Sequence, residues 1–402
     1  MASSLVTKPE TMTAESALKF EALEAQATAL LEIFRRAGYE QVAPSIIQPA
    51  DIFLDQIGES IRSRTYVFTD LAGDELCLRP DLTVPVSRLY LERHPSADWP
   101  ARYCYNGPAF RFQPDRRNQA HPREFRQAGI ECFGETDREG ADVEVVLLAV
   151  EAVRSAGLKD FRLRFGDIAL FYALLDALSL PERWRLKLRH YFWRPPVFHA
   201  LLARLARGER PNGDGLVMAL ADRLAGLPSE RAEELVGAYL EGNGLPLSGN
   251  RSLSEITARL LDHAADLRAD PLPREVATVI DYYLAVSGPP KEAAGRVAMI
   301  AKGAGIDLGP ALYALVNRFG RLEASGIDLS ACTFATEFGR NLEYYSGLVF
   351  QIEAGGERDA DQIAGGGRYD GLLAHIGAPR EVPAIGSAIH TERLLAAVER
   401  GS

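Results

Sequence analysis

The stretch FRFQPDRRNQAHPREFRQAGIE, from Phe110 to Glu131, decides the fold because it has the pattern of two strands joined by a basic loop. Arg111 leads into the loop, and Gln127 and Glu131 lie on the returning strand. The latter two are four residues apart, so their side chains share one face of a strand, and the hairpin brings Arg111 beside them. Polar groups inside apolar strands are costly without a partner or ligand, so the stretch predicts a polar pocket on this sheet.

Three other segments place charged or aromatic groups in apolar surroundings: LRPDLT at 78–83, EFGRNLEYYSG at 337–347 and GGGRYDG at 365–371. Taken singly, each has an ordinary structural explanation, because a buried arginine can hold a carboxylate, tyrosines can pack, and glycines can form a turn. Together with the hairpin, they favour a single pocket to which all four segments contribute.

Five motifs, in this order, resemble those of the histidyl-tRNA synthetase family. LRPDLT resembles the LRPEGT-type segment of that family, the Arg111 hairpin resembles the second class II synthetase motif, and RNLEYY is similar to RGLDYY. GGGRYDG matches a histidine-specific motif, and PAIGSAIHTERLL at 383–395 is similar to the third class II motif. The resemblance extends from Ala14 to Val398 and is weak through the middle of the chain.

Strand patterns at both ends of the chain, with helical periodicity between them, predict an α+β core interrupted by a helical insertion. The resemblance makes this a class II aminoacyl-tRNA synthetase-like core, an antiparallel sheet flanked by helices. We expect its first part at 1–178, the helical insertion domain at 179–326 and its second part at 327–402. The chain ends at Ser402, directly after the third motif, so we expect no anticodon-binding domain.

The resemblance also implies an amino-acid pocket. By position, Asp81, Thr83 and Gln127 hold the α-amino group of L-histidine, and Glu131 and Tyr345 hold its imidazole. The chemistry agrees, because an ammonium needs a carboxylate acceptor and an imidazole N–H needs an acceptor opposite it. The expected histidine-binding residues are Asp81, Thr83, Arg111, Gln127, Glu131, Arg340, Tyr344, Tyr345 and Tyr369.

The nucleotide side of the resemblance is altered. Gln113 replaces an acid after the arginine of the second motif, and His390 replaces a glycine before the Glu-Arg pair of the third. Glycine at such a site permits close approach of a flat ligand, and an imidazole fills that space. Asn341 replaces a further glycine. The motif positions for the nucleotide have thus changed, while those for the amino acid remain. This combination predicts a histidine sensor with no catalytic residue, metal or cofactor of its own.

This pattern resembles the synthetase paralogues that serve as regulatory subunits of short-form ATP phosphoribosyltransferase, the enzyme that starts histidine biosynthesis. The resemblance implies a short-form catalytic subunit as partner, allosteric feedback by histidine, and a homodimer, paired through residues 43–66, within a hetero-octamer. The alternative is a histidine-adenylating or synthetase-like enzyme that lacks the anticodon-binding domain.

Composition is that of an ordinary globular protein: 402 residues, 47% hydrophobic and 25% charged, with no apolar run long enough to span a membrane. Four scattered cysteines without a CxxC pair favour a reducing cytoplasm and buried thiols rather than a metal site. The net charge of −10 disfavours nucleic acid as a partner.

The stretch RWRLKLRHYFWRPP, from Arg183 to Pro196, combines basic and aromatic residues in a way that is also typical of RNA-binding segments. Trp184, Leu188 and Tyr191 have helical spacing, however, which favours a helix that packs inward and keeps a solvated basic rim. Contact with the catalytic partner is a third interpretation of the same residues.

Overall fold

The computed structural model describes residues 17–55, 59–113, 122–209, 215–224, 226–244, 252–339, 344–355 and 362–401. The chain forms two compact units. The first comprises Met1–Phe165, Asn317–Thr333 and Tyr344–Ser402, and the second comprises Gly166–Val316 and Phe334–Glu343. The three-part division expected from the sequence, with limits at 178/179 and 326/327, stays a prediction.

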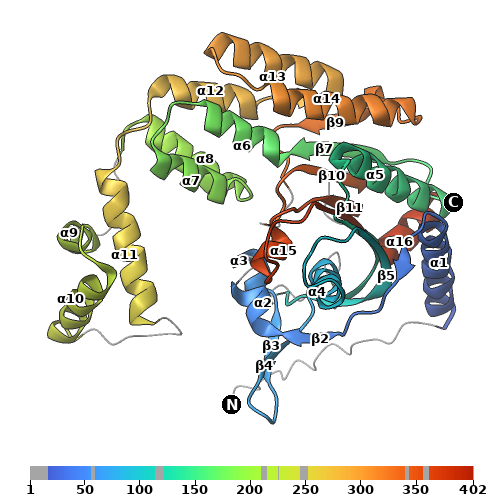
Figure 1. The fold of residues 1–402 in the computed structure, drawn as a ribbon, viewed down its shortest axis with the longest axis horizontal. Helices are drawn as coiled ribbons and strands as arrows, with labels where there is room; N and C mark the ends of the chain where they lie inside the picture. Colours follow the sequence, from blue (N-terminus) through green and yellow to red (C-terminus); the bar gives the residue numbers. More distant parts are fainter. Residues whose placement is uncertain are drawn as a thin grey trace, which may run out of the picture. The chain divides into compact units, whose positions relative to one another are not determined.

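The first unit is built on a curved sheet with the strand order β1-β5-β6-β12-β11-β10-β7 (Figure 1). Its strands are β1 (Glu40–Gln41), β5 (Ala101–Phe110), β6 (Glu124–Phe133), β7 (Arg162–Asp167), β10 (Leu348–Glu353), β11 (Gln362–Arg368) and β12 (Ala384–His390). Neighbouring strands from β5 to β10 are antiparallel.

The expectation of an antiparallel sheet needs one correction, because β1 pairs with β5 in parallel and the sheet is mixed. The physical reason is that α1 (Ala17–Arg36) ends beside the sheet and a tight turn at Gly38 returns the chain along β5 rather than against it. Gly38 has a φ of 90°, a left-handed conformation that glycine adopts without strain.

Three helices cover the convex face of the sheet: α1, α5 (Arg138–Ser155) and α16 (Thr391–Gly401). The helix α4 (Thr83–Arg93) lies inside the curve of the sheet (Figure 1), and α15 (Leu372–His375) contacts it. The helix α1 buries an apolar stripe at helical spacing, whereas α5 is buried around most of its circumference. The strand β6 is almost wholly buried because both faces of the sheet are covered.

A smaller sheet in the same unit has the order β2-β4-β3, with β2 (Ile47–Pro49), β3 (Tyr66–Thr69) and β4 (Glu75–Leu78). The short helices α2 (Ala50–Asp55) and α3 (Glu59–Arg62) connect β2 to β3. The predicted hairpin turn at Asp70–Asp74 is confirmed: the Asp70 carboxylate accepts from the backbone N–H groups of Ala72 and Asp74, and Gly73 has a φ of 95°.

The second unit is mainly helical. It contains α6 (Ile168–Ala177), α7 (Glu182–Tyr191), α8 (Pro195–Ala206), α9 (Gly215–Leu224), α10 (Ser229–Gly242), α11 (Leu253–Arg268), α12 (Arg274–Leu284), α13 (Pro290–Ala304) and the start of α14 (Gly309–Ala324). β8 (Ser287–Gly288) pairs with β9 (Cys332–Ala335), which follows the short helix η1 (Leu329–Ala331). The buried rings of Phe171 and Phe192 stack with centroids 4.1 Å apart, and Phe198 meets both of them edge to face at 5.7 and 5.9 Å.

The basic aromatic stretch forms α7 and the start of α8, as the helical spacing predicts. Trp184 and Leu188 are buried, and the Trp184 ring N–H donates to the Asp270 carbonyl at 2.6 Å. Lys187 pairs with the carboxylate of Asp266 at 2.5 Å, and Arg183 pairs with the same carboxylate at 2.8 Å. Ion pairs within the unit therefore occupy these cations, which argues against contact with phosphates.

All four cysteines are buried free thiols, as expected for core residues. Burial raises the pKa of the Cys77 thiol to about 12 and that of the Cys132 thiol to about 11. No helix in the described ranges is both long and apolar enough to cross a membrane.

A buried ion network joins α5 to β11 and to the last turns of α14. Asp142 has no exposed surface, and its carboxylate accepts from the Arg368 guanidinium at 2.6 and 2.8 Å and from Arg318 Nε at 2.6 Å. Arg368 also donates to Asp370 at 2.9 Å. Attraction to the two carboxylates outweighs burial and raises the pKa of Arg368, so the guanidinium stays charged.

We expect Asp142→Ala to destabilise the protein by about 3–5 kcal/mol, because it leaves two buried guanidinium groups without their shared carboxylate. Urea unfolding followed by circular dichroism measures the change. The matched control is Glu40→Gln, which removes an exposed pair with Arg93 and should cost no more than about 1 kcal/mol. Equal effects of the two substitutions would refute the central role given to Asp142.

Candidate functional site

The candidate site lies on the concave face of the main sheet, where β5, β6, β12 and β11 are neighbours. Residues directly opposite each other in neighbouring strands have side chains on the same face. Glu131 is opposite Tyr103 on β5 and Gly386 on β12, and Gln127 is opposite Gly107 and His390. The predicted face shared by Gln127 and Glu131 is therefore confirmed by the strand register.

Glu131 is the centre of the site, and its side chain is fully buried. The Tyr105 hydroxyl donates to one carboxylate oxygen at 3.1 Å, and the Tyr369 hydroxyl donates to the other. The Thr83 hydroxyl also hydrogen-bonds to this carboxylate. Burial raises the pKa of Glu131 to about 8, although the three hydroxyl groups act in the opposite direction.

Three glycines on the sheet make room for the side chains of the site. A Cβ on Gly386 would collide with the Glu131 carboxylate, and one on Gly129 would lie 2.5 Å from the Tyr105 hydroxyl. A Cβ on Gly367 would come within 3.0 Å of the Tyr345 ring. Close packing over the sheet thus requires glycine at positions 129, 367 and 386.

The segment before α4 adds a second carboxylate. Asp81 is buried, and its Oδ1 accepts from the backbone N–H of Val84 at 3.2 Å. Its Oδ2, and Oε1 of the buried Gln127, have no hydrogen-bond partner within the described ranges. Burial raises the pKa of Asp81, and the nearby charge of Arg111 opposes that effect. A buried acceptor without a partner is a place for a ligand's N–H group, and this site has two of them.

Arg111 lies at the other end of the site. Its Nε donates to the Pro80 carbonyl at 2.8 Å, and its guanidinium carbon lies 5.0 Å from the centre of the Phe125 ring. The His390 ring packs on Phe125 as well, with a centroid distance of 5.3 Å. His390, which stands where the family motif has a glycine, thus fills the space beside the Phe125 ring.

The tyrosines of the last two motifs pack together over the pocket. The Tyr344 ring lies 4.8 Å from that of Tyr345 and 5.7 Å from that of Tyr369, in the latter case edge to face. Tyr345 and Tyr369 are buried. Two positions named from the sequence, Arg340 and Asn341, lie outside the described residues, as does the basic loop at 114–121.

Tyr105 is a member of the site that the motifs did not reveal. The YCYNG run reads as an ordinary apolar strand, and its second tyrosine stands out only when the hairpin register is known. The Arg111 N–H donates to the Arg123 carbonyl, and counting back along the hairpin from that pair places Tyr105 opposite Gly129. The signal in the sequence that could have indicated Tyr105 is its pairing with Gly129, which leaves room for the tyrosine ring.

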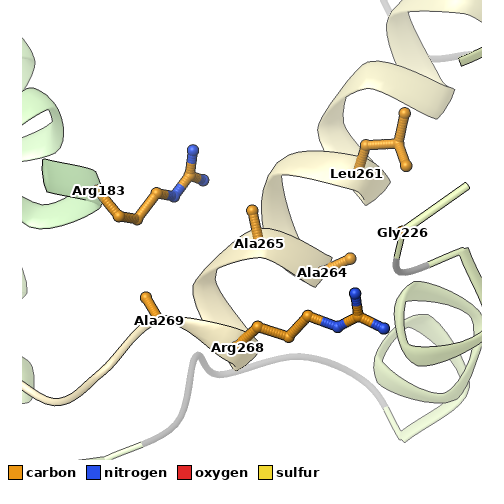
Figure 2. A pocket seen from close by; sticks show the side chains of 7 residues that line it. All are labelled: Arg183, Gly226, Leu261, Ala264, Ala265, Arg268 and Ala269. Carbon is orange, nitrogen blue, oxygen red and sulfur yellow. The ribbon is translucent and has the colours of Figure 1, made fainter. Parts of the chain in front are cut away.

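A second hollow lies in the helical unit, and Figure 2 shows the side chains around it: Arg183, Gly226, Leu261, Ala264, Ala265, Arg268 and Ala269. Its floor is the alanine-rich face of α11. Arg183 is already paired with Asp262 and Asp266. The lining lacks the convergent polar groups that the pocket around Glu131 has.

Comparison with known proteins agrees with this geometry. The histidyl-tRNA synthetase family model matches residues 16–226 and 250–394. An ATP phosphoribosyltransferase regulatory subunit from Mesorhizobium japonicum is 36% identical over 382 residues, which cover 94% of this chain and 97% of that protein. The protein of the same name from Agrobacterium fabrum is 36% identical over 379 residues, 93% of this chain and 96% of its own length.

Solved structures have the same fold. An ATP phosphoribosyltransferase regulatory subunit/histidyl-tRNA synthetase from Bacillus halodurans matches 99% of this chain and 84% of its own, with a TM-score of 0.64 and 20% identity. A histidine–tRNA ligase subunit from Alicyclobacillus acidocaldarius matches 100% of this chain and 99% of its own, with a TM-score of 0.61 and 25% identity.

The fold and the pocket define a class II aminoacyl-tRNA synthetase-like core. The chain belongs to the histidyl-tRNA synthetase family and, within it, to the group of ATP phosphoribosyltransferase regulatory subunits. The fold class and the family expected from the five motifs are thereby confirmed.

We expect Gly386→Ala to lower stability by about 1–3 kcal/mol, because the added methyl group meets Glu131 and the Ile130 carbonyl in a closely packed sheet. Gly295→Ala is the matched control, since this exposed glycine of α13 has open space around its Cβ position. There alanine should stabilise the helix by about 0.5–1 kcal/mol. Thermal unfolding of both variants tests the contrast, and a neutral Gly386→Ala would contradict the packing described.

Proposed function

We propose that this chain is the regulatory subunit of a short-form ATP phosphoribosyltransferase and that it binds L-histidine in the pocket around Glu131. In this role it is needed for activity of the catalytic subunit and for histidine feedback on the first step of histidine biosynthesis, in the cytoplasm. The names of the relatives support the regulatory role. The histidine ligand is supported by one observation above all, the unsatisfied acceptors of Asp81 and Gln127 beside the buried Glu131.

The pocket fits the groups of histidine in a definite order. Asp81 Oδ2 and Gln127 Oε1 accept from the α-ammonium group, and Glu131 accepts from the imidazole ring. Thr83, whose hydroxyl hydrogen-bonds to Glu131, joins Asp81 and Gln127 at the ammonium group. Tyr345 and Tyr369 enclose the ring, and Arg111 faces the ligand's carboxylate. Arg340 is proposed for that same carboxylate from its place in the family motif.

The alternative, a histidine-adenylating enzyme, needs a place for the adenine ring. By family resemblance the nucleotide side is where His390 replaces a glycine, and here the His390 ring packs on the buried Phe125, over which Arg111 also lies. An occupied aromatic face offers less area for stacking. This packing favours a sensor over an adenylating enzyme.

The proposed homodimer is supported by apolar residues on the surface of the small sheet, within and beside residues 43–66. The exposed large side chains there are Ile46, Ile47, Val67, Phe68 and Leu71. A group of exposed apolar side chains is typical of a protein–protein interface. The hetero-octamer with the catalytic subunit is proposed from the family resemblance.

Isothermal titration calorimetry tests the ligand. We expect the wild-type chain to bind L-histidine and Glu131→Ala to lose at least about tenfold in affinity, since a hydrogen bond to a charged group contributes about 1.5–3 kcal/mol. Glu92→Ala, at an exposed position of α4, is the control and should bind as the wild type does. Binding by Glu131→Ala at wild-type affinity would exclude this pocket.

Reconstitution tests the role. We expect addition of this chain to a short-form catalytic subunit to stimulate phosphoribosyl-ATP formation, and histidine to inhibit the mixture. The isolated chain should show no histidine-dependent exchange between ATP and pyrophosphate. Exchange by the isolated chain, without stimulation of the catalytic subunit, would instead support the adenylating enzyme.

A further inference from the structure

Among the residues that the structure describes, Glu131 has no positively charged partner. Its carboxylate is fully buried, and its hydrogen-bond partners are the hydroxyl groups of Tyr105, Tyr369 and Thr83. Within the described ranges it forms no ion pair, and the charged group that acts on it is Asp81, another acid. Buried carboxylates are usually paired with a cation, because an isolated charge is costly to desolvate.

We propose that the pocket binds histidine with its side chain as an imidazolium, which forms the missing ion pair with Glu131. This inference rests on the proposed function and specifies the charge state of its ligand. In the empty pocket Glu131 carries a proton, and on binding that proton moves from the carboxyl group to the ring nitrogen. The complex then holds one proton between the two groups, and no net proton is exchanged with solvent near neutral pH.

The hydrogen bonds around Glu131 favour the cation over neutral imidazole. A neutral imidazole has one N–H donor and one acceptor nitrogen, so it needs a donor as well as an acceptor from the pocket. The hydroxyl protons of Tyr105 and Tyr369 are already directed at Glu131. Glu131 and these two hydroxyl groups therefore offer a ligand oxygen acceptors, and an imidazolium ring, with two N–H donors, is their complement. The Tyr345 hydroxyl, proposed to lie at the same ring, can donate or accept and so fits either charge state.

The titratable groups around Glu131 give the inference its pH range. They are Tyr105 on β5, Tyr369 directly after β11, and Asp81 in the segment before α4. Beyond them, Arg111 acts on Asp81, Tyr344 packs on Tyr369, and Tyr345 lies close to Gly367. Burial keeps the pKa of Tyr105 and Tyr369 well above the usual value, so both hydroxyls stay neutral. The pKa of Glu131, raised to about 8, is the one that falls in the working range.

The expected pH profile has a maximum. Above pH 8 the empty pocket and free histidine have both lost the proton that the complex needs, so affinity falls tenfold for each further pH unit. Below about pH 6.5, the usual imidazole pKa, both partners are protonated and one proton must leave, so affinity falls again. A carboxylate that accepts from neutral imidazole would instead gain affinity as pH rises to 8 and then hold it.

Calorimetry with the full-length chain from pH 5.5 to 9.5 tests this profile, with Glu131→Gln as the matched control. Titration of the ligand's α-amino group affects both proteins, so the informative quantity is the ratio of wild-type to variant affinity. We expect that ratio to fall at least fivefold between pH 8 and 9. A ratio that stays constant or rises would overturn the inference, as would no loss of affinity for Glu131→Gln at neutral pH.

Two further measurements separate this inference from the proposed function. Nuclear magnetic resonance of ¹⁵N-labelled histidine in the complex at pH 7.5 should show both ring nitrogens protonated, where free histidine is mainly neutral. Triazolylalanine, whose ring stays neutral, should bind at least tenfold more weakly than histidine. Equal binding of the two, with a neutral bound ring, would overturn the charge assignment alone, whereas no binding of histidine would overturn the proposed function.

Discussion

The buried carboxylate of Asp142 fixes the end of β11, from which Tyr369 reaches the site. Asp142 holds the Arg368 guanidinium at the end of β11, and Arg368 in turn holds Asp370. Between these two anchored residues lies Tyr369, whose hydroxyl reaches the opposite side and donates to Glu131. Only the tyrosine of the RYD sequence therefore faces the pocket. Its neighbours set the position of that tyrosine through an ion network that solvent does not screen.

Two fully buried acids in one unit thus have opposite surroundings. Asp142 has two guanidinium groups and is complete without a ligand, whereas Glu131 has three hydroxyl groups and no cation among the described residues. The contrast follows from desolvation, since a buried charge without a counter-charge is tolerated mainly where a ligand or a proton supplies one. Asp142 therefore stabilises the fold, whereas Glu131 can accept a positively charged ligand group.

How far the sequence predicts the site depends on the range of the interaction. The face shared by Gln127 and Glu131 follows from strand periodicity, and the Asp70 turn follows from local hydrogen bonding, so both were predictable. Tyr105 was not, because its role depends on the hairpin register. The Arg318–Asp142 pair joins residues 176 positions apart, and no local pattern indicates such a contact. The parallel pairing of β1 likewise depends on how α1 docks.

Gly386 and His390 show how one strand can keep one half of a site and close the other. Both lie on the same face of β12, four residues apart, opposite Glu131 and Gln127 respectively. At position 386 any side chain would displace the Glu131 carboxylate, so the proposed histidine pocket requires glycine there. At position 390 an imidazole packs on Phe125, and the chain gains an aromatic contact where the family resemblance puts a nucleotide. A side chain at position 390 can therefore fill space on the nucleotide side while glycine stays at position 386. The proposed amino-acid pocket beside it then keeps its shape.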